Sequence, residues 1–349
     1  MAKTYTATGR LEIIGNHTDH QGGHVLAMPT KEKIYAEVTD NGCDNIRIFS
    51  EGFEPIELNI FEDNSYEQGT SRALLVGILD GFAKKYGRIQ VHNAGWDAHI
   101  KTEIKPGGGT SSSAAYEILL ARIIIDKHYN NLASPIELAK IGKYAENEYY
   151  GKSCGLQDQL AASAAKSGQL ILMDFKNEEP TYELIDFNFE KFGYKIELIE
   201  SHTDHADNTI EFESIIADYN LIANELGVKQ LGDIRKSEFE SKLPDLEYKI
   251  SQGKFTRDQL DRAIHFYNEN ERVIAGANAL KQGDTKTFLK CVNESTLSSQ
   301  NALKNITPKS VTENNLSKLI DEYRTKPSTS AIKLQGGGFG GNIIVFSKK

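Results

Sequence analysis

Cysteine, proline and tryptophan are scarce in this sequence, and no stretch of it is both long and apolar. Its 349 residues include 3 cysteines, 8 prolines and 1 tryptophan. Cys43, Cys154 and Cys291 are widely spaced and form no CxxC pair, so we expect neither a disulfide framework nor a structural zinc site. No segment approaches the roughly 20 apolar residues of a membrane helix, and residues 1–10 lack the apolar core of a secretory signal. We therefore expect a cytoplasmic protein that does not bind membranes.

The charge of the chain argues against nucleic acid as its partner. Its 49 acidic residues outnumber its 40 lysines and arginines, which gives a formal net charge of −9 at pH 7. No basic patch is long enough to offset this charge. A chain of this length that is 39% hydrophobic buries a large core, in one large domain or about two. The partners that we expect are small molecules, and we take the chain to be a monomer.

Apolar residues recur at the spacings of strands and helices along the chain. Alternation predicts strands at residues 33–39, 46–50, 56–60, 98–104, 169–175, 194–200, 331–335 and 342–347. Apolar residues three and four apart predict helices at residues 72–86, 116–129, 135–149, 155–165, 210–226, 257–281, 285–302 and 315–323. Ser134, followed by Pro135 and Glu137, is expected to cap one of them. Because strands and helices do not alternate strictly, the sequence predicts an α+β fold.

A polar loop at residues 176–188 is our candidate for a domain boundary. It lies between two predicted strands and precedes a part of the chain dominated by predicted helices. We therefore divide the chain into an N-terminal domain, residues 1–185, and a C-terminal, mostly helical domain, residues 186–349.

Two runs of glycine predict places where a ligand approaches the backbone closely. Residues 336–341 are all glycine except Phe339 and lie between two predicted strands. Residues 107–109 are glycines as well, and a threonine and three serines lead from them into a helix-forming stretch at 114–126. Unpaired N–H groups and the helix dipole at such a helix start both favour an anion. Two loops of this kind in one chain indicate a protein that handles phosphate.

Two further segments contain polar side chains suited to ligand binding or catalysis. Residues 9–23 place Asn16, His17, Asp19 and His20 between glycines, which suits a ligand rich in hydroxyl groups but also a solvated loop. Asp158 is a lone acid at a predicted helix start. It is suited to accept a proton from an attacking hydroxyl, with Arg10 keeping it ionised, or it is merely an aspartate favoured by the helix dipole. Spacing alone leaves both interpretations open.

Together these segments resemble the galactokinase branch of the GHMP small-molecule kinases, over nearly the whole chain. Residues 9–28 are similar to the galactokinase signature, residues 105–115 to the phosphate-binding motif, residues 153–159 to the catalytic-aspartate segment and residues 334–345 to the third motif. Motifs in this order and at these separations are a specific likeness. The resemblance implies a two-domain GHMP-kinase-like fold with the active site in the cleft between the domains. It also implies an ATP-dependent sugar 1-kinase.

The resemblance assigns roles to matching residues. Arg10 and Asp158 would be the catalytic pair, and His17, Asp19 and Gly155 would hold the sugar. ATP would bind at Gly107, Gly108, Gly109, Thr110, Ser111, Ser112, Ser113, Gly337 and Gly338. A serine hydroxyl of this loop would reach Mg²⁺. We choose Ser112, with its two serine neighbours as rivals.

Two of the expected sugar contacts differ from the family pattern. Galactokinases usually carry Glu at the position of Asn16, where the acid contacts the exocyclic hydroxyl of the sugar. An amide still bonds a hydroxyl, without the strength that charge adds. Counting seven residues on from His205, the tyrosine that touches the sugar becomes Phe212, which has no hydroxyl. The expected substrate is therefore galactose or a close relative such as N-acetylgalactosamine.

The nucleotide site differs too. Lys105 takes the place of the proline at the head of the phosphate loop, and the aromatic residues expected near adenine are absent around residues 72–77. Trp96 is too far along the chain to replace them. The sequence does not decide between ATP and GTP.

Parts of the sequence also suggest three other functions. The repeated His-Thr-Asp-His at residues 17–20 and 202–205 suggests a metal-dependent hydrolase, but no HExxH or comparable spacing supports it. A non-catalytic sugar sensor would not need both Arg10 and Asp158. Mevalonate and homoserine kinases of the same family lack the His-Thr-Asp sugar loop.

Overall fold

The structure is a computed structural model that describes residues 2–105, 108–202, 209–308 and 314–349. The chain divides into two compact units. Unit 1 comprises Met1–Arg10, Pro29–Pro106 and Thr110–Ser167, and unit 2 comprises Leu11–Met28, Gly107–Gly109 and Gly168–Lys349. The boundary predicted between residues 185 and 186 falls within unit 2, inside a strand.

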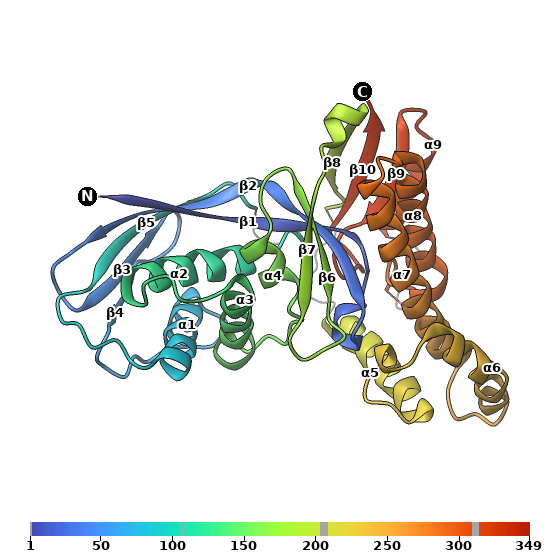
Figure 1. The fold of residues 1–349 in the computed structure, drawn as a ribbon, viewed down its shortest axis with the longest axis horizontal. Helices are drawn as coiled ribbons and strands as arrows, with labels where there is room; N and C mark the ends of the chain where they lie inside the picture. The colour runs from blue at the N-terminus through green and yellow to red at the C-terminus, as the bar shows by residue number, and fades with distance from the viewer. Residues whose placement is uncertain (1, 106–107, 203–208, 309–313) are drawn as a thin grey trace. The chain divides into compact units, whose positions relative to one another are not determined.

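Unit 1 combines β-strands with a layer of helices. Its strands come from β1 (Lys3–Ile14), β2 (His24–Asp40), β3 (Asn45–Ser50), β4 (Ile56–Asn59) and β5 (Trp96–Thr102). They follow the order β4-β3-β5-β2, and β1 pairs with β2. The helices are α1 (Ser71–Tyr86), α2 (Ser112–His128), α3 (Pro135–Tyr144) and α4 (Gln157–Ala164), with the π-helical turn η2 (Ala145–Tyr150) after α3. These helices lie along one face of the strands (Figure 1).

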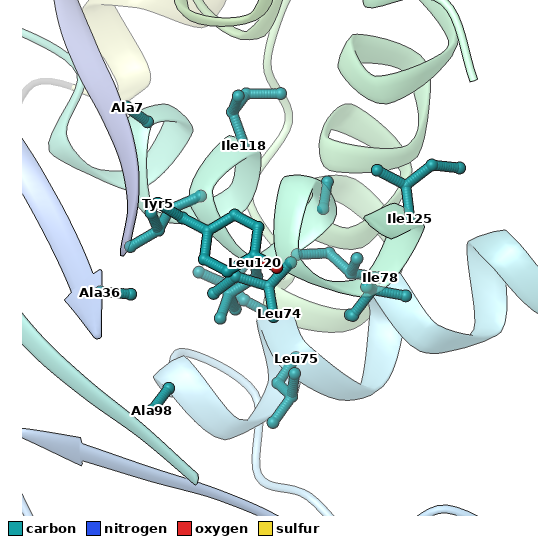
Figure 2. Close-up of a cluster of buried hydrophobic side chains, with 14 of the residues drawn as sticks. Tyr5, Ala7, Ala36, Leu74, Leu75, Ile78, Ala98, Ile118, Leu120 and Ile125 are labelled. Carbon is teal, nitrogen blue, oxygen red and sulfur yellow. The ribbon is translucent and has the colours of Figure 1, made fainter. Parts of the chain in front are cut away.

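The core of unit 1 lies between that face and the helices. Figure 2 shows Tyr5 and Ala7 of β1 beside side chains of α1 and α2, among them Leu74, Ile78 and Ile118. The lone tryptophan, Trp96, is fully buried in this core and donates from Nε1 to His128 Nε2 at 3.1 Å. Trp96 is therefore a core residue in this structure.

Unit 2 contains two groups of strands and most of the helices. β6 (Gln169–Asp174) pairs with β2 and β7 (Thr181–Asp186), and a second sheet has the order β8 (Tyr194–Glu200), β10 (Asn342–Lys348), β9 (Thr329–Leu334). The helices are α5 (Thr209–Leu226), α6 (Lys236–Ser251), α7 (Arg257–Lys281), α8 (Thr285–Ser298) and α9 (Asn315–Thr325). Shorter turns are η1 (Asp19–Gln21), η3 (Phe189–Phe192), η4 (Leu231–Asp233) and the π-helical η5 (Ser299–Leu303).

The strands that flank the glycine run 336–341 are buried on both faces. Ile344 and Phe346 of β10 pack with Val273 and Val292 of α7 and α8. Ile343 and Val345, which point the other way, pack with Leu316 and Ile320 of α9. A strand covered on both sides explains the unbroken apolar run that the sequence shows there.

Most of the predicted elements are present. The helices predicted at 72–86 and 257–281 match α1 and α7, and the strands predicted at 194–200 and 342–347 match β8 and β10. Ser134 forms the expected capping box with Glu137 at the start of α3. β3 and β5 pair in parallel, whereas β2–β5, β3–β4 and β6–β7 are antiparallel, so the α+β prediction is confirmed.

Four segments were missed, for local reasons. β1 and the first half of β2 were not predicted as strands: residues 9–14 of β1 were analysed as part of a ligand loop, and glycine and arginine at positions 9 and 10 interrupt the alternation of β1. β7 lies within the polar segment predicted as loop. α6 is rich in Lys, Glu and Asp, contains Pro244, and buries Phe239 and Leu246. No helix in the part of the chain described here is long and apolar enough to cross a membrane.

Candidate active site

Arg10 and Asp158 form a two-point ion pair in unit 1. Arg10 lies on β1 and is 7% exposed, and Asp158 lies in the first turn of α4. Arg10 donates from Nε to Asp158 Oδ1 at 2.8 Å and from Nη2 to Oδ2 at 3.1 Å. The planar guanidinium thus matches both oxygens of the carboxylate, which fixes its orientation as well as its charge. Two residues 148 positions apart meet as the sequence suggested, and their catalytic role stays a prediction.

Ser111 joins the same pair. It is the N-cap of α2 and also donates its hydroxyl to Asp158 Oδ2. Its backbone is left-handed, with φ 61° and ψ 56°, a conformation that costs a non-glycine residue about 1–2 kcal/mol. Packing holds the loop in place, because Arg10 N donates to Thr110 O at 3.0 Å and a Cβ at Gly9 would lie 2.1 Å from that oxygen.

Two buried acids beside the serine run were missed by sequence reasoning. Glu117 of α2 has no exposed surface, and Glu146 of η2 is 3% exposed. Gln159 Nε2 donates to both, at 3.0 Å to Glu117 Oε2 and 2.7 Å to Glu146 Oε2. Burial and the nearby Glu146 carboxylate raise the pKa of Glu117 well above its usual value. The available signal was Glu117, an acid in the middle of the apolar helical stretch at 114–126.

The serine run has a carboxylate bonded to each end. Ser111 donates to Asp158, and Ser113 donates to Glu146 Oε1 at 3.1 Å. Ser112, the first residue of α2, lies between them in the sequence. Carboxylate and hydroxyl oxygens are the ligands that Mg²⁺ prefers, so this set of donors fits the ion that the resemblance implies.

His17 lies in the predicted sugar loop, in unit 2. Its φ is 59°, its ring nitrogen Nε2 lies 3.0 Å from Gly337 O, and the Phe212 ring centroid is 4.6 Å away. Burial, and secondly the nearby His20, lower the pKa of His17 to about 3. The ring is therefore neutral near pH 7. Because a carbonyl oxygen only accepts, the proton is on Nε2, and Nδ1 is an acceptor.

The other residues predicted to bind the sugar differ in how far they are buried. Asn16 has no exposed surface, and its side chain is bonded to Glu12, Gly336, Ser299 and Asn305. This arrangement does not support the predicted direct contact of Asn16 with the sugar. Asp19, which begins η1, and Phe212, near the start of α5, are half-buried. Gly155, also half-buried, lies in unit 1, three positions before Asp158.

The two glycine runs meet within unit 2. Gln335 Nε2 donates to Gly109 O at 2.9 Å, and Asn342 Nδ2 donates to Gly108 O. Gly107 lies outside the described residues.

Within the second run, the glycines are required by close neighbours. A Cβ at Gly337 would lie 2.7 Å from the Phe212 ring, and one at Gly338, where φ is 88°, would lie 2.0 Å from Asn305 O. Gly337 thus contacts predicted sugar residues, and its predicted contact with the nucleotide stays a prediction.

No cluster of three His, Cys, Asp or Glu side chains suited to hold a metal ion occurs among the described residues. The second His-Thr-Asp-His segment lies mostly outside that part of the chain, since residues 203–208 are not described.

Two models of known families match parts of this chain. The model of the GHMP kinases N terminal domain matches residues 73–166, and the model of the galactokinase galactose-binding signature matches residues 2–39. These matches confirm the resemblance to the galactokinase branch of the GHMP kinases: the chain contains a GHMP kinase N-terminal domain and the galactokinase galactose-binding signature.

Relatives and a solved structure agree with this placement. A galactokinase of Thermotoga petrophila is 29% identical over 98% of this chain and 89% of its own length. A galactokinase of Lactobacillus helveticus is 26% identical over 99% of this chain and 85% of its own length. The crystal structure of Lactococcus lactis galactokinase complexed with galactose has a TM-score of 0.85 at 22% identity, covering 99% of this chain and 86% of that one. At that identity the structural likeness shows the fold alone.

Proposed function

We propose that this protein is an ATP-dependent galactokinase that phosphorylates the anomeric hydroxyl of galactose. The observation that carries the proposal is the Arg10–Asp158 pair, with the Ser111 hydroxyl on the same carboxylate at the start of α2. The galactose-binding signature at residues 2–39 and the galactokinases among its relatives support the choice of sugar.

The chain's own residues supply a base and its orientation. Asp158 accepts the proton of the attacking sugar hydroxyl as that oxygen bonds to the γ-phosphorus of ATP and the bond to the β–γ bridging oxygen breaks. Arg10 and Ser111 hold the carboxylate in one orientation, so the proton acceptor is in place before the reaction. Arg10 also offsets negative charge that accumulates on the phosphoryl group.

The nucleotide and its metal would use the serine run and the glycine runs. Ser112 and Glu146 would hold Mg²⁺, which when bound neutralises charge on the transferring phosphoryl group. Backbone N–H groups at the start of α2 favour phosphate, because the helix leaves them without partners inside the helix. In unit 2, His17 Nδ1 is an acceptor that lies 3.4 Å from His20 Nε2, and a sugar hydroxyl would replace this long contact as its donor.

A test follows turnover with a panel of sugars. Purified protein with ATP and Mg²⁺ is expected to consume ATP with galactose, with N-acetylgalactosamine as the alternative substrate and glucose as the epimer control. Asp158→Asn is expected to lower kcat by about 10²–10⁴-fold, the usual contribution of a general base. Asp284→Asn is the control, because Asp284 also lies at the start of a helix, as the N-cap of α8, and Asn caps equally well.

The outcomes separate the alternatives. ATP consumption with none of these sugars would refute the proposal. If sugar and nucleotide bind without turnover, the non-catalytic sensor becomes the better description.

A further inference from the structure

Asn16 is held by protein partners at every polar atom. Its side chain donates from Nδ2 to Glu12 Oε1 at 2.8 Å and to Gly336 O at 2.7 Å. Its Oδ1 accepts from Asn305 Nδ2 at 2.6 Å and from Ser299 Oγ at 3.4 Å. A residue with 0% exposure and four such bonds has no hydrogen-bonding capacity left for a sugar.

The backbone of Asn16 is fixed as firmly. Asn16 N donates to Glu269 Oε1 at 3.3 Å, and His265 Nε2 lies 3.0 Å from Asn16 O. Burial lowers the pKa of His265 to about 4, so this ring is neutral and donates from Nε2. Its Nδ1 accepts from Ser298 Oγ at 2.8 Å. Side chains of α7 therefore hold the loop at the residue next to His17.

A short chain of hydrogen bonds leads from Asn16 to the ring of His17. Asn305 Nδ2, which donates to Asn16 Oδ1, also donates to Gly337 O at 3.0 Å. That same carbonyl accepts from His17 Nε2. Asn16 Nδ2 donates to the preceding carbonyl, Gly336 O. The two consecutive glycine carbonyls therefore accept hydrogen bonds from two consecutive residues of the sugar loop, Asn16 and His17.

We propose that Asn16 is a positioning residue of the sugar site: through Asn305 and the Gly337 carbonyl it fixes the His17 ring with its proton on Nε2 and its acceptor on Nδ1. The inference rests on the proposed function in one respect, that His17 binds the sugar. It assigns Asn16 a different role from the glutamate that the family resemblance implies there.

The charge around Asn16 explains why an acid does not fit. Glu12, 4% exposed, lies 3.4 Å from the fully buried Lys333 Nζ, so this buried pair is neutral as a whole. A carboxylate at position 16 would face Glu12 Oε1 and Gly336 O, both acceptors, and would add a further buried acid to Glu12 and Glu269. Asn16→Glu is therefore expected to lower the melting temperature and weaken sugar binding.

The main test uses Asn16→Asp, which keeps the shape and removes both donors. We expect the Kd for galactose, measured by calorimetry, to rise at least about tenfold, since a misplaced ligand group costs about that much or more. The Kd for Mg-ATP is expected to change less than about twofold. Leu316→Ala is the control for lost stability alone, because Leu316 is a buried side chain of α9 in unit 2.

A second readout needs no substrate. The ¹⁵N spectrum of His17, assigned with His17→Gln, is expected to show a protonated Nε2 and an unprotonated Nδ1 in the wild type. In Asn16→Asp we expect both nitrogens to move toward averaged values. A double variant, Glu12→Gln with Asn16→Asp, exchanges donor and acceptor in that contact and is expected to recover part of the galactose affinity.

The outcomes decide the proposal. An unchanged Kd for galactose together with an unchanged His17 spectrum in Asn16→Asp would overturn it, and so would equal losses in Asn16→Asp and Leu316→Ala. Asn16→Asp removes the Nδ2 donors and keeps an acceptor for Asn305, so if it does not fold, Asn305→Ala breaks the link from Asn16 to Gly337 O directly and is judged by the same readouts. If the wild type turns over no sugar, the proposed function fails, while the His17 spectrum still decides the role of Asn16.

Discussion

The Arg10 guanidinium contacts both oxygens of Asp158, and this geometry distinguishes arginine from lysine at position 10. Arg10 is nearly buried, while the Asp158 side chain is 34% exposed on the other side of the pair. Ser111 adds a third hydrogen bond to the carboxylate. Arg10 and Ser111 thus orient the Asp158 carboxylate while part of it stays exposed, and a proton acceptor must be accessible to its substrate.

Arg10→Lys tests whether the two-point contact matters beyond its charge. Lysine keeps the positive charge but offers a point contact in place of a planar fork, so the carboxylate loses its fixed orientation. We expect kcat to fall about 10–100-fold, with the KM for galactose little changed. Steady-state kinetics measure both. Arg122→Lys is the control, because Arg122 donates to backbone carbonyls of Thr6, Ala162 and Ser163 and not to the Asp158 carboxylate. Equal kcat values for Arg10→Lys and wild type would show that charge alone suffices.

Within unit 1, the π-helical turn η2 carries Glu146 and packs against α1. The contact requires a glycine: a Cβ on Gly77 would lie 2.8 Å from Tyr149 Cγ and 2.9 Å from Ala145 Cα. One turn later, a Cβ on Gly81 would meet a side-chain methyl of Ile141 at 3.0 Å. The tightest backbone contact of α1 is therefore with the segment that holds a proposed metal ligand.

Gly77→Ala is expected to destabilise the protein although alanine favours helices. The overlap with backbone of η2 costs about 1–3 kcal/mol, whereas the gain in helix propensity is about 1 kcal/mol. Gly81→Ala on the same helix is the matched control and is expected to cost less. Urea unfolding measures the free energy of unfolding of each variant. If Gly77→Ala is as stable as Gly81→Ala or more so, the packing argument is wrong.

The start of α3 gives a prediction about pH. Lys85, and then the Ser134 backbone N–H, lower the pKa of Glu137 from 4.5 to about 2. Because the pKa in the folded state is below the usual value, the ionised carboxylate stabilises the fold above about pH 4.5, and this contribution is lost as the pH falls toward 2.

Glu137→Gln keeps a capping-box residue and removes the charge. We expect it to cost about 0.5–1 kcal/mol near pH 7, a modest value because the pair is partly exposed. The difference from wild type is expected to shrink between about pH 4.5 and 2, when unfolding is measured across that range. A difference that stays constant with pH would rule out the charge as its source.

The residues that the proposed reaction needs are divided between the two units of the molecule. Arg10, Asp158 and the serine run belong to unit 1, whereas the sugar loop and both glycine runs belong to unit 2. The proposed contacts with galactose and with Mg-ATP exist only in the folded chain, so both ligands are expected to bind the folded state and not the unfolded one. Binding to the folded state raises its stability in proportion to the logarithm of ligand concentration.

Galactose is accordingly expected to raise the free energy of unfolding by about 2.7 kcal/mol at a concentration one hundred times its Kd. Thermal unfolding with galactose, N-acetylgalactosamine and glucose, each with and without Mg-ATP, measures the effect. Glucose is expected to shift the melting temperature less than galactose. If N-acetylgalactosamine stabilises the protein and galactose does not, the substrate in our proposal is wrong while the kinase class remains. Light scattering at the same concentrations tests the prediction of a monomer of 38.8 kDa.

Much of the fold and part of the site followed from local sequence. The apolar run of β10, the capping box at Ser134 and the helical spacing of α7 are patterns within a single element. The glycine runs could also be recognised from the sequence, because consecutive residues without side chains indicate a turn or a close approach to the backbone. Elements with few apolar residues, such as α6, show too weak a hydrophobic periodicity to be predicted as helices.

By itself the sequence indicated the resemblance to galactokinases, most of the elements and the hypothesis that Arg10 and Asp158 act together. Only the tertiary structure decided what surrounds Asn16 and which acids adjoin the serine run. Asn16 bonds with Asn305, 289 positions away, and Glu117 and Glu146 share Gln159 across three different elements. Whether a polar side chain binds ligand or protein depends on which donors and acceptors folding places beside it, and that is a property of packing that no local pattern contains.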